Sequence, residues 1–239
     1  MQEPELKPNS TRDRLIVALD TATVDDARAI VDDLADEVTF YKIGLELITN
    51  GGMDLAREIT ASGRRVFLDM KFLDIGNTVE RAVANVARRG VSFLTIHGTD
   101  SKTMSAAVSG AAGSELQLLA VTVLTNLAEA DLEEQGIAGL SPSQLVLKRA
   151  LLAKSSGCHG VIASGQEAAA VREAAGEDLL IVTPGIRLPD DDVGDQKRIT
   201  TPSRAISDGA DYLVVGRPIT QAQDRRAAAA RMLDDISRA

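Results

Sequence analysis

The stretch Arg65-Val-Phe-Leu-Asp-Met-Lys-Phe-Leu-Asp-Ile-Gly-Asn-Thr78 joins an expected strand to an expected helix. Its first half, Arg65–Lys71, is a short run rich in apolar residues and is typical of a strand. Asp74 follows where the chain turns away, and Gly76-Asn-Thr78 opens the next helical stretch. A strand followed directly by a helix predicts one βα unit of a parallel sheet.

Comparable units recur along the whole chain, and the first five begin about 25 residues apart, the length of one strand plus one helix. The expected strands lie near Arg14–Asp20, Val38–Gly44, Arg65–Lys71, Val91–His97, Gln117–Leu124, Cys158–Ser164, Leu179–Thr183 and Tyr212–Gly216. Eight such units favour closure of the sheet. We therefore expect an α/β protein with one domain, a (β/α)₈ TIM barrel over residues 13–239, after a flexible N-terminal tail over residues 1–12.

Local signals refine this expectation. Thr23 is expected to cap an amphipathic helix, and two helices are expected between the fifth and sixth strands, the second starting at Ser141-Pro142. Arg187–Thr201 is rich in proline, glycine and charge and is expected to be a long functional loop. An open doubly wound sheet is the alternative, but Ala18-Leu-Asp-Thr-Ala-Thr23 lacks the GxGxxG turn of that fold.

Composition excludes several classes of function. The 239 residues carry a net charge of −9 and only 3% aromatic residues, which argues against nucleic-acid binding. No apolar run approaches the ~20 residues of a membrane span, and the polar opening lacks a signal sequence, so a cytoplasmic location is expected. The single cysteine, Cys158, allows no internal disulfide or cysteine-based metal site and is expected to be a buried apolar residue.

Ionisable residues gather where the expected strands end. The first four strands carry Asp20, Lys42, Asp69 with Lys71, and His97, and Thr125 follows the fifth. A single one could simply mark the point where a strand meets solvent. Three consecutive strands ending in Asp or Lys instead indicate a site, because buried charges are costly unless they pair and barrel active sites lie at this end of the strands.

Asp69 and Lys71 are two residues apart on one strand and should point to the same side. At ~4 Å and an effective dielectric near 20, each lysine–carboxylate pair is worth about 4 kcal/mol before desolvation, so we expect Lys71 to keep its charge. A fixed ammonium among carboxylates is suited to stabilising a developing carbanion and then protonating it. His97 is expected to be structural and hydrogen-bonded beneath the site, and His159 to face away from it.

A phosphate-binding end is indicated by the last two strands. Thr183-Pro-Gly-Ile-Arg187 follows the seventh strand, Gly194-Asp-Gln-Lys-Arg198 lies in the long loop, and Val215-Gly-Arg217 follows the eighth. The loops after strands seven and eight are the usual phosphate site of such barrels. Gly216 would let the backbone approach a ligand, and Arg217 can donate two hydrogen bonds to a phosphate. A phosphate-monoester ligand is therefore predicted.

Eight segments together carry a resemblance to a known family: Leu15-Ile-Val-Ala-Leu-Asp20, Tyr41-Lys-Ile-Gly44, Val66–Thr78, Thr95-Ile-His-Gly98, Thr122-Val-Leu-Thr-Asn126, Val182-Thr-Pro-Gly-Ile-Arg187, Gly194-Asp-Gln-Lys-Arg198 and Leu213-Val-Val-Gly-Arg217. They resemble the bacterial type of the orotidine 5′-phosphate decarboxylase family over nearly the whole chain. The resemblance implies a carboxy-lyase of pyrimidine biosynthesis that converts orotidine 5′-phosphate to uridine 5′-phosphate and carbon dioxide without metal or organic cofactor.

The resemblance also implies roles for individual residues. Lys71 would protonate C6 of the pyrimidine, Asp69 would face the substrate carboxylate, and Asp20 and Lys42 would hold the ribose hydroxyls. Thr125 would contact the base, Gln196 would bridge base and phosphate, and Arg187, Gly216 and Arg217 would bind the phosphate. Asp74, Ile75 and Thr78 would reach into the site of a neighbouring subunit, which implies a homodimer.

Two other readings remain open at this stage. The Asp-x-Lys-x-x-Asp core is shared with sister barrels, such as 3-keto-L-gulonate-6-phosphate decarboxylase and hexulose-phosphate synthase, which act on sugar phosphates with a bound magnesium ion. A barrel that binds nucleotides without catalysis is a different class, although a mere binding protein has no reason to retain a costly buried charge cluster.

Overall fold

The computed structural model describes residues 7–189 and 200–239. Eight parallel strands follow one another in chain order and close into a barrel, because β1 pairs with both β2 and β8. The strands are β1 (Leu15–Ala18), β2 (Phe40–Gly44), β3 (Arg65–Phe72), β4 (Phe93–His97), β5 (Gln117–Val121), β6 (Gly160–Ile162), β7 (Leu180–Thr183) and β8 (Tyr212–Val215). The predicted TIM barrel is confirmed, and the open-sheet alternative is wrong.

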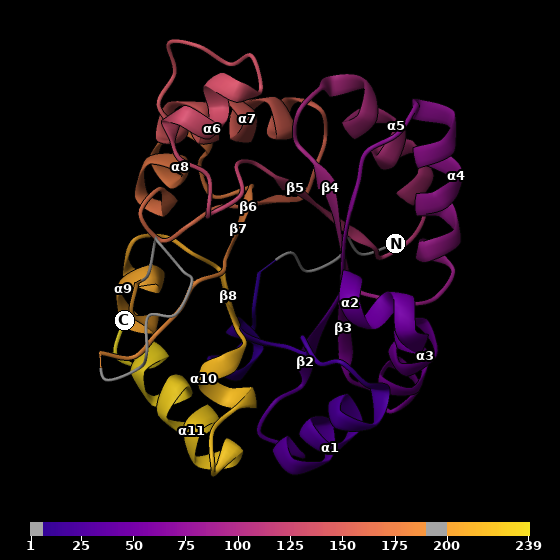
Figure 1. Cartoon of the computed structure of the whole chain (residues 1–239), viewed down its shortest axis with the longest axis vertical. Helices are drawn as coiled ribbons and strands as arrows, with labels where there is room; N and C mark the ends of the chain where they lie inside the picture. Colours follow the sequence, from indigo (N-terminus) through magenta and orange to yellow (C-terminus); the bar gives the residue numbers. More distant parts are fainter. Residues whose placement is uncertain (1–6, 190–199) are drawn as a thin grey trace.

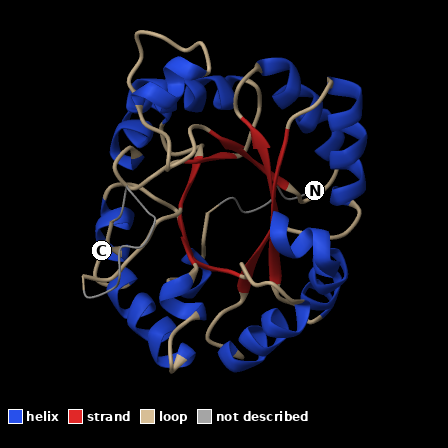
Figure 2. Ribbon diagram, viewed as in Figure 1, coloured by secondary structure: helices blue, strands red, loops and turns tan. Residues whose placement is uncertain are grey.

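Helices surround the strands as an outer ring (Figures 1 and 2). They are α1 (Val24–Leu34), α2 (Leu45–Leu47), the π-helical η2 (Ile48–Gly52), α3 (Met53–Ala61), α4 (Gly76–Ala87), α5 (Ser101–Ala111), α6 (Glu129–Glu134), α7 (Pro142–Ser155), α8 (Ala168–Ala175), α9 (Pro202–Ser207), α10 (Arg217–Thr220) and α11 (Arg225–Ile236), and the short 3₁₀ helix η1 (Arg12–Arg14) precedes β1. Their buried apolar faces pack on the outside of the barrel.

The local predictions are largely confirmed. The Thr23 side chain accepts a hydrogen bond from the backbone of Asp26 and caps α1, and α7 begins at Pro142 after the cap Ser141. Several strands are shorter than expected. Asp20, expected to end the first strand, lies beyond β1, because strand pairing between β1 and β2 stops at Ala18.

Some expectations fall outside the described residues. Residues 1–6 of the expected tail and residues 190–199 of the expected loop, with Gln196 among them, belong to this part. The ends of that loop are described: Ile186 and Thr200 form a parallel bridge, and the Arg187 amide donates to the Thr200 carbonyl at 3.0 Å. The loop therefore leaves and rejoins the barrel at one place.

Aromatic residues fill one end of the barrel interior. Phe40, Phe67, Phe93 and Tyr212 pack edge to face, with ring centroids 5.0–6.0 Å apart. The Arg65 guanidinium covers this layer from outside, 4.2 Å from the Phe40 centroid. Since alternate strand residues face inward, the positions two residues after Phe40 and Phe67, on the other side of this layer, are Lys42 and Asp69. The barrel is thus filled at its N-terminal end and polar at its C-terminal end.

The starts of β7 and β8 are tied together by Arg172 of α8. Its guanidinium donates to the carbonyl of Leu179 at 2.9 Å and to the carbonyl of Gly209 at 2.8 Å. It also contacts the Asp211 carboxylate at 2.6 Å, and that carboxylate accepts from the amide of Ile181 at 2.8 Å. Both strands therefore begin at one largely buried ion pair, Arg172–Asp211.

Candidate active site

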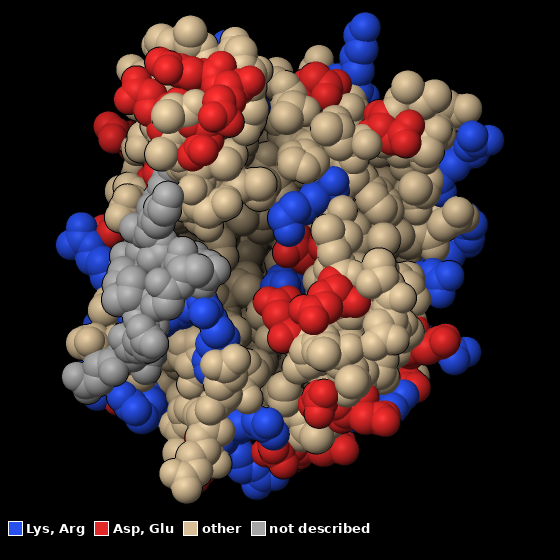
Figure 3. All heavy atoms as spheres, viewed as in Figure 1, with Lys and Arg blue, Asp and Glu red and all other residues tan. Residues whose placement is uncertain are grey.

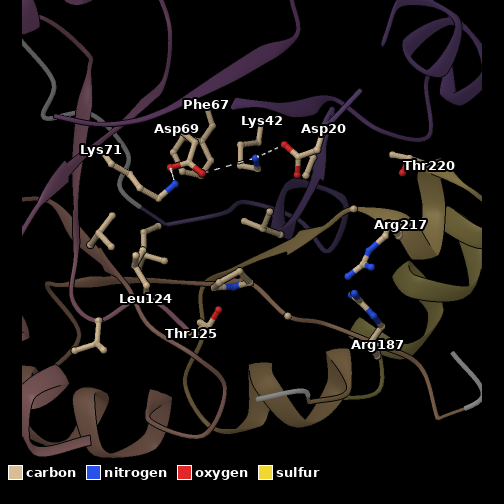
Figure 4. A pocket seen from close by; sticks show the side chains of 18 of the residues that line it. Asp20, Lys42, Phe67, Asp69, Lys71, Leu124, Thr125, Arg187, Arg217 and Thr220 are labelled. Atoms are coloured by element: carbon tan, nitrogen blue, oxygen red, sulfur yellow. Dashed lines mark hydrogen bonds and ion pairs between the residues drawn. The ribbon is translucent and has the colours of Figure 1, made fainter. Parts of the chain in front are cut away.

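Four charged side chains of alternating sign form a row at the C-terminal end of β1–β3. Lys42 Nζ lies 2.8 Å from Asp20 Oδ1 and 3.7 Å from Asp69 Oδ2, and Lys71 Nζ lies 2.7 Å from Asp69 Oδ1. Figure 4 shows the row along one side of a cavity. Each charge has an opposite neighbour, so the row tolerates a burial that isolated charges would not.

Lys71 reaches this row through an irregularity in β3. Leu68 pairs with Leu94 and Phe72 pairs with Ile96, so three residues of β3 lie opposite Thr95 alone. Lys71 has φ +49°, a left-handed conformation that costs a residue other than glycine about 1–2 kcal/mol. The expectation that Asp69 and Lys71 point to the same side is confirmed by their 2.7 Å contact, although the strand between them is irregular.

Gly44 makes room for the first pair of the row. A Cβ at this position would lie 3.1 Å from Asp20 Oδ1 and 3.2 Å from Lys42 Nζ. Lys42 itself is only 8% exposed, whereas the Asp20 side chain is 57% exposed. A larger residue at position 44 would therefore push the ion pair away from the backbone.

Burial alone would raise the pKa of Asp69, but the positive charges of Lys42 and Lys71 and hydrogen bonds from Lys71 and Thr95 outweigh it and hold that pKa below its ordinary value. Asp69 is consequently an anion at neutral pH. Burial lowers the pKa of His97, at the end of β4, and the charges of Lys71 and Arg149 lower it further. His97 is therefore neutral at pH 7, and its expected hydrogen bonding stays a prediction.

The opposite side of the cavity carries two arginines. Arg187 follows β7 and is 7% exposed, and Arg217 follows β8. In Figure 4 their guanidinium groups lie close to one another, at the end of the cavity opposite Asp69 and Lys71. Gly185 has φ +79°, which favours glycine and lets the chain turn between β7 and Arg187. The two ends of the cavity thus differ in chemistry, one mixed in charge and the other cationic.

The cavity encloses about 430 Å³, a size suited to a ligand as large as a nucleotide. Figure 3 shows the hollow in the face at the C-terminal ends of the strands, with acidic and basic side chains at its rim. Its lining includes eight of the predicted residues: Asp20, Lys42, Asp69, Lys71, Thr125, Arg187, Gly216 and Arg217. Between them lie apolar side chains such as Phe67, Val121 and Ile162.

Three predicted residues do not line this cavity. Asp74 and Ile75 are exposed, Ile75 at 74%, and Thr78 is half-buried on the first turn of α4. Gln196 lies outside the described residues. Within residues 7–189 and 200–239, no three His, Cys, Asp or Glu side chains gather in a way that would hold a metal ion. No helix in the same ranges is long and apolar enough to cross a membrane.

Comparison with known proteins decides the family. The profile of the Orotidine 5′-phosphate decarboxylase / HUMPS family matches residues 13–232, nearly the whole chain. The chain belongs to this family. Among curated relatives, the orotidine 5′-phosphate decarboxylase of Bradyrhizobium sp. strain BTAi1 is 54% identical over 95% of this chain and 93% of its own length. That of Methylobacterium nodulans is 53% identical over 96% of this chain and 98% of its own length.

Two solved structures agree with this chain in fold. The crystal structure of orotidine 5′-phosphate decarboxylase from Lactobacillus acidophilus matches with a TM-score of 0.82 and 37% identity, covering 93% of this chain and 98% of that one. An uncharacterized conserved protein from Geobacillus kaustophilus matches with a TM-score of 0.81 and 32% identity, covering 93% and 99%. The resemblance stated from the sequence is thereby confirmed.

Two residues lie in the site although they were not predicted to belong to it. Thr95 is fully buried and donates to Asp69, and Gly44 lies against the Asp20–Lys42 pair. Both stand in segments that carry the resemblance, Thr95-Ile-His-Gly98 and Tyr41-Lys-Ile-Gly44. Their place in these segments was the signal that the sequence offered.

Proposed function

We propose that this orotidine 5′-phosphate decarboxylase uses Lys71 as the proton donor to C6 of the pyrimidine. The enzyme converts orotidine 5′-phosphate to uridine 5′-phosphate and carbon dioxide in pyrimidine biosynthesis, as its family and the names of its curated relatives indicate. The observation that supports Lys71 is its 2.7 Å contact with the half-buried Asp69 at the cavity end remote from the arginines.

The reaction breaks one carbon–carbon bond and makes one carbon–hydrogen bond. The bond between C6 and the substrate carboxylate breaks, carbon dioxide leaves, and the electron pair stays on C6. The Lys71 ammonium stabilises this carbanion and then gives it a proton. Asp69, held as an anion, faces the substrate carboxylate, and this crowding of like charges raises the ground state relative to the transition state.

Other residues hold the parts of the substrate that do not react. Asp20 and Lys42 bind the ribose hydroxyls, and Thr125 contacts the base. Arg187, Gly216 and Arg217 bind the phosphate, and Gln196 bridges base and phosphate. Binding energy gathered at the phosphate is then available to position C6 at Lys71 and to exclude water.

Asp74, Ile75 and Thr78 are proposed to serve the site of a second subunit in a homodimer. Two features support this. They follow β3 directly, yet they do not line the cavity of their own subunit. Ile75 and Leu73 are 74% and 55% exposed, which leaves an apolar surface beside the cavity mouth that a second copy would cover.

The activity is tested by the loss of orotidine 5′-phosphate absorbance with purified, chelator-treated protein. Unchanged turnover after chelation is expected, whereas dependence on added magnesium would favour the sister-barrel activity. Binding of uridine 5′-phosphate without turnover would support a non-catalytic barrel.

The role of Lys71 is tested with Lys71→Ala, which should stay folded, bind uridine 5′-phosphate and lose turnover. Lys102→Ala, which removes an exposed lysine from α5, is the matched control and should retain full activity. Retained decarboxylation in Lys71→Ala would overturn the proton-donor role.

The shared site is tested by mixing two inactive variants, Lys71→Ala and Asp74→Ala. If Asp74 completes the neighbouring site, a mixed dimer carries one intact site and one doubly altered site. Random exchange of subunits should then restore about a quarter of the wild-type sites. A mixture no more active than the sum of its components would place Asp74 in its own subunit's site or outside any site.

A further inference from the structure

Thr95, in the middle of β4, contacts two groups of the proposed reaction centre with one hydroxyl. The Lys71 backbone amide donates to Thr95 Oγ1 at 2.9 Å, and Thr95 Oγ1 donates to Asp69 Oδ1 at 2.8 Å. The direction of both bonds is fixed, because an amide N–H can only donate and an ionised carboxylate can only accept. The single hydroxyl proton is therefore committed to Asp69.

The position of Thr95 follows from the irregularity of β3. It is the one residue of β4 opposite Asp69, Met70 and Lys71, where the regular pairing between the two strands is interrupted. The amide of Lys71, turned by its left-handed backbone, finds its acceptor in a side chain of the neighbouring strand. Thr95 is fully buried, so bulk water does not reach its hydroxyl.

Both Thr95 and the Lys71 ammonium contact the same carboxylate oxygen. Lys71 Nζ lies 2.7 Å from Asp69 Oδ1, the atom that accepts from the hydroxyl at 2.8 Å. One hydroxyl therefore links the backbone of Lys71 to the carboxylate that its own ammonium contacts. Without the hydroxyl, the carboxylate could rotate about its last bond, and the Lys71 amide would lose its acceptor on β4.

We propose that Thr95 is a positioning residue for decarboxylation, which fixes the Asp69 carboxylate and the backbone turn that presents the Lys71 ammonium to C6. This inference rests on the proposed function and extends it to a residue that contacts neither the reacting carbon nor the phosphate. A small misplacement of a proton donor lowers a rate strongly, because proton transfer needs near-contact geometry.

The test compares Thr95→Val, which keeps the shape and loses the hydroxyl, with Thr95→Ser, which keeps the hydroxyl and loses a methyl group. Thr95→Val should lower kcat by about 10- to 100-fold and change KM little, because the lost bonds orient the reacting groups and not the phosphate. Thr95→Ser should stay within about threefold of wild type. Thr95→Ala, which also lacks the hydroxyl, replaces Thr95→Val if the latter does not fold.

The pH dependence separates positioning from a merely structural role. The charged and titratable groups around Asp69 are Lys42 from β2 and Lys71 from β3, with Asp20 beyond Lys42 and His97 beyond Lys71. Loss of a hydrogen bond to the ionised carboxylate favours its protonation, so the acidic limb of kcat should move to higher pH in the hydroxyl-free variant and stay in place in the serine variant.

Each outcome distinguishes the two levels of the proposal. A wild-type protein that fails to decarboxylate orotidine 5′-phosphate removes the proposed function itself. An active wild type with a valine variant of unchanged kcat and unchanged acidic limb overturns the role of Thr95 alone. A serine variant as slow as the valine variant also overturns it, because the methyl group and not the hydroxyl would then matter.

Discussion

The left-handed backbone of Lys71 makes a stability prediction that is independent of its chemistry. Lys71→Ala and Lys71→Gly both remove the ammonium and should both lose turnover, so they differ only in the backbone cost. At φ +49°, a residue with a Cβ destabilises the folded state by about 1–2 kcal/mol. Glycine avoids this strain, but its greater freedom in the unfolded chain offsets about 0.5–1 kcal/mol of the gain. Lys71→Gly should therefore be more stable than Lys71→Ala by about 0.5–1 kcal/mol.

The measurement is urea or thermal unfolding of the two variants under identical conditions. For a chain of this length, the difference corresponds to a rise in Tm of about 1–4 °C. Ala35, after α1, is the other described non-glycine residue with positive φ, at 41°, and Ala35→Gly should raise stability in the same direction with activity intact. Equal stability of the two Lys71 variants, alongside a stabilised Ala35→Gly, would refute the claim that the site stores backbone strain.

Three further predictions concern charge. Arg217→Ala should lower kcat/KM by about 100-fold or more with little loss of stability, because its side chain is exposed and its proposed partner is the substrate phosphate; near-normal kinetics would remove the phosphate-binding argument. Asp69→Asn should destabilise the protein at neutral pH, and unfolding measurements should show that this loss of stability becomes smaller in acid. The reason is that a carboxylate whose pKa is lowered by folding stabilises the fold at pH values above the ordinary Asp pKa. This contribution is lost as the pH falls through the pKa of the folded state. His97→Gln should make the free energy of unfolding fall less steeply as the pH drops below about 6.5. Burial lowers the pKa of His97, so the unfolded chain binds a proton at this histidine before the folded protein does. An unchanged dependence of the unfolding free energy on pH would mean that His97 is not held neutral.

The architecture was predictable because it repeats. Eight strand-and-helix units follow one another along the chain, and closure follows from their number, so small errors in strand ends did not change the fold. The meeting of Asp20, Lys42, Asp69 and Lys71 was predictable for the same reason, because the carboxyl ends of neighbouring parallel strands lie side by side. The capping residues Thr23 and Ser141 were readable because their side chains act on the backbone next to them.

The details that shape the site were not predictable from local sequence. Asp69-Met-Lys-Phe72 contains no glycine or proline to mark an interruption, so the left-handed turn at Lys71 depends on contacts with β4. In the sequence, Thr95 is typical of a buried β-branched residue in a strand. Its hydroxyl finds its two hydrogen-bond partners only because the turn at Lys71 lies opposite it. Gly44 likewise acts through side chains brought to it by two strands.

The shared origin of β7 and β8 at Arg172 has a consequence for recognition at their far ends. Strands are stiff, and two that leave a common anchor cannot spread apart without breaking its hydrogen bonds. Arg187 and Arg217 follow these strands, so the distance between the two arginines depends on the anchor at the other end of the barrel. If the two arginines bind the substrate phosphate as proposed, their spacing is set before binding, and little of the binding energy is spent on bringing them together.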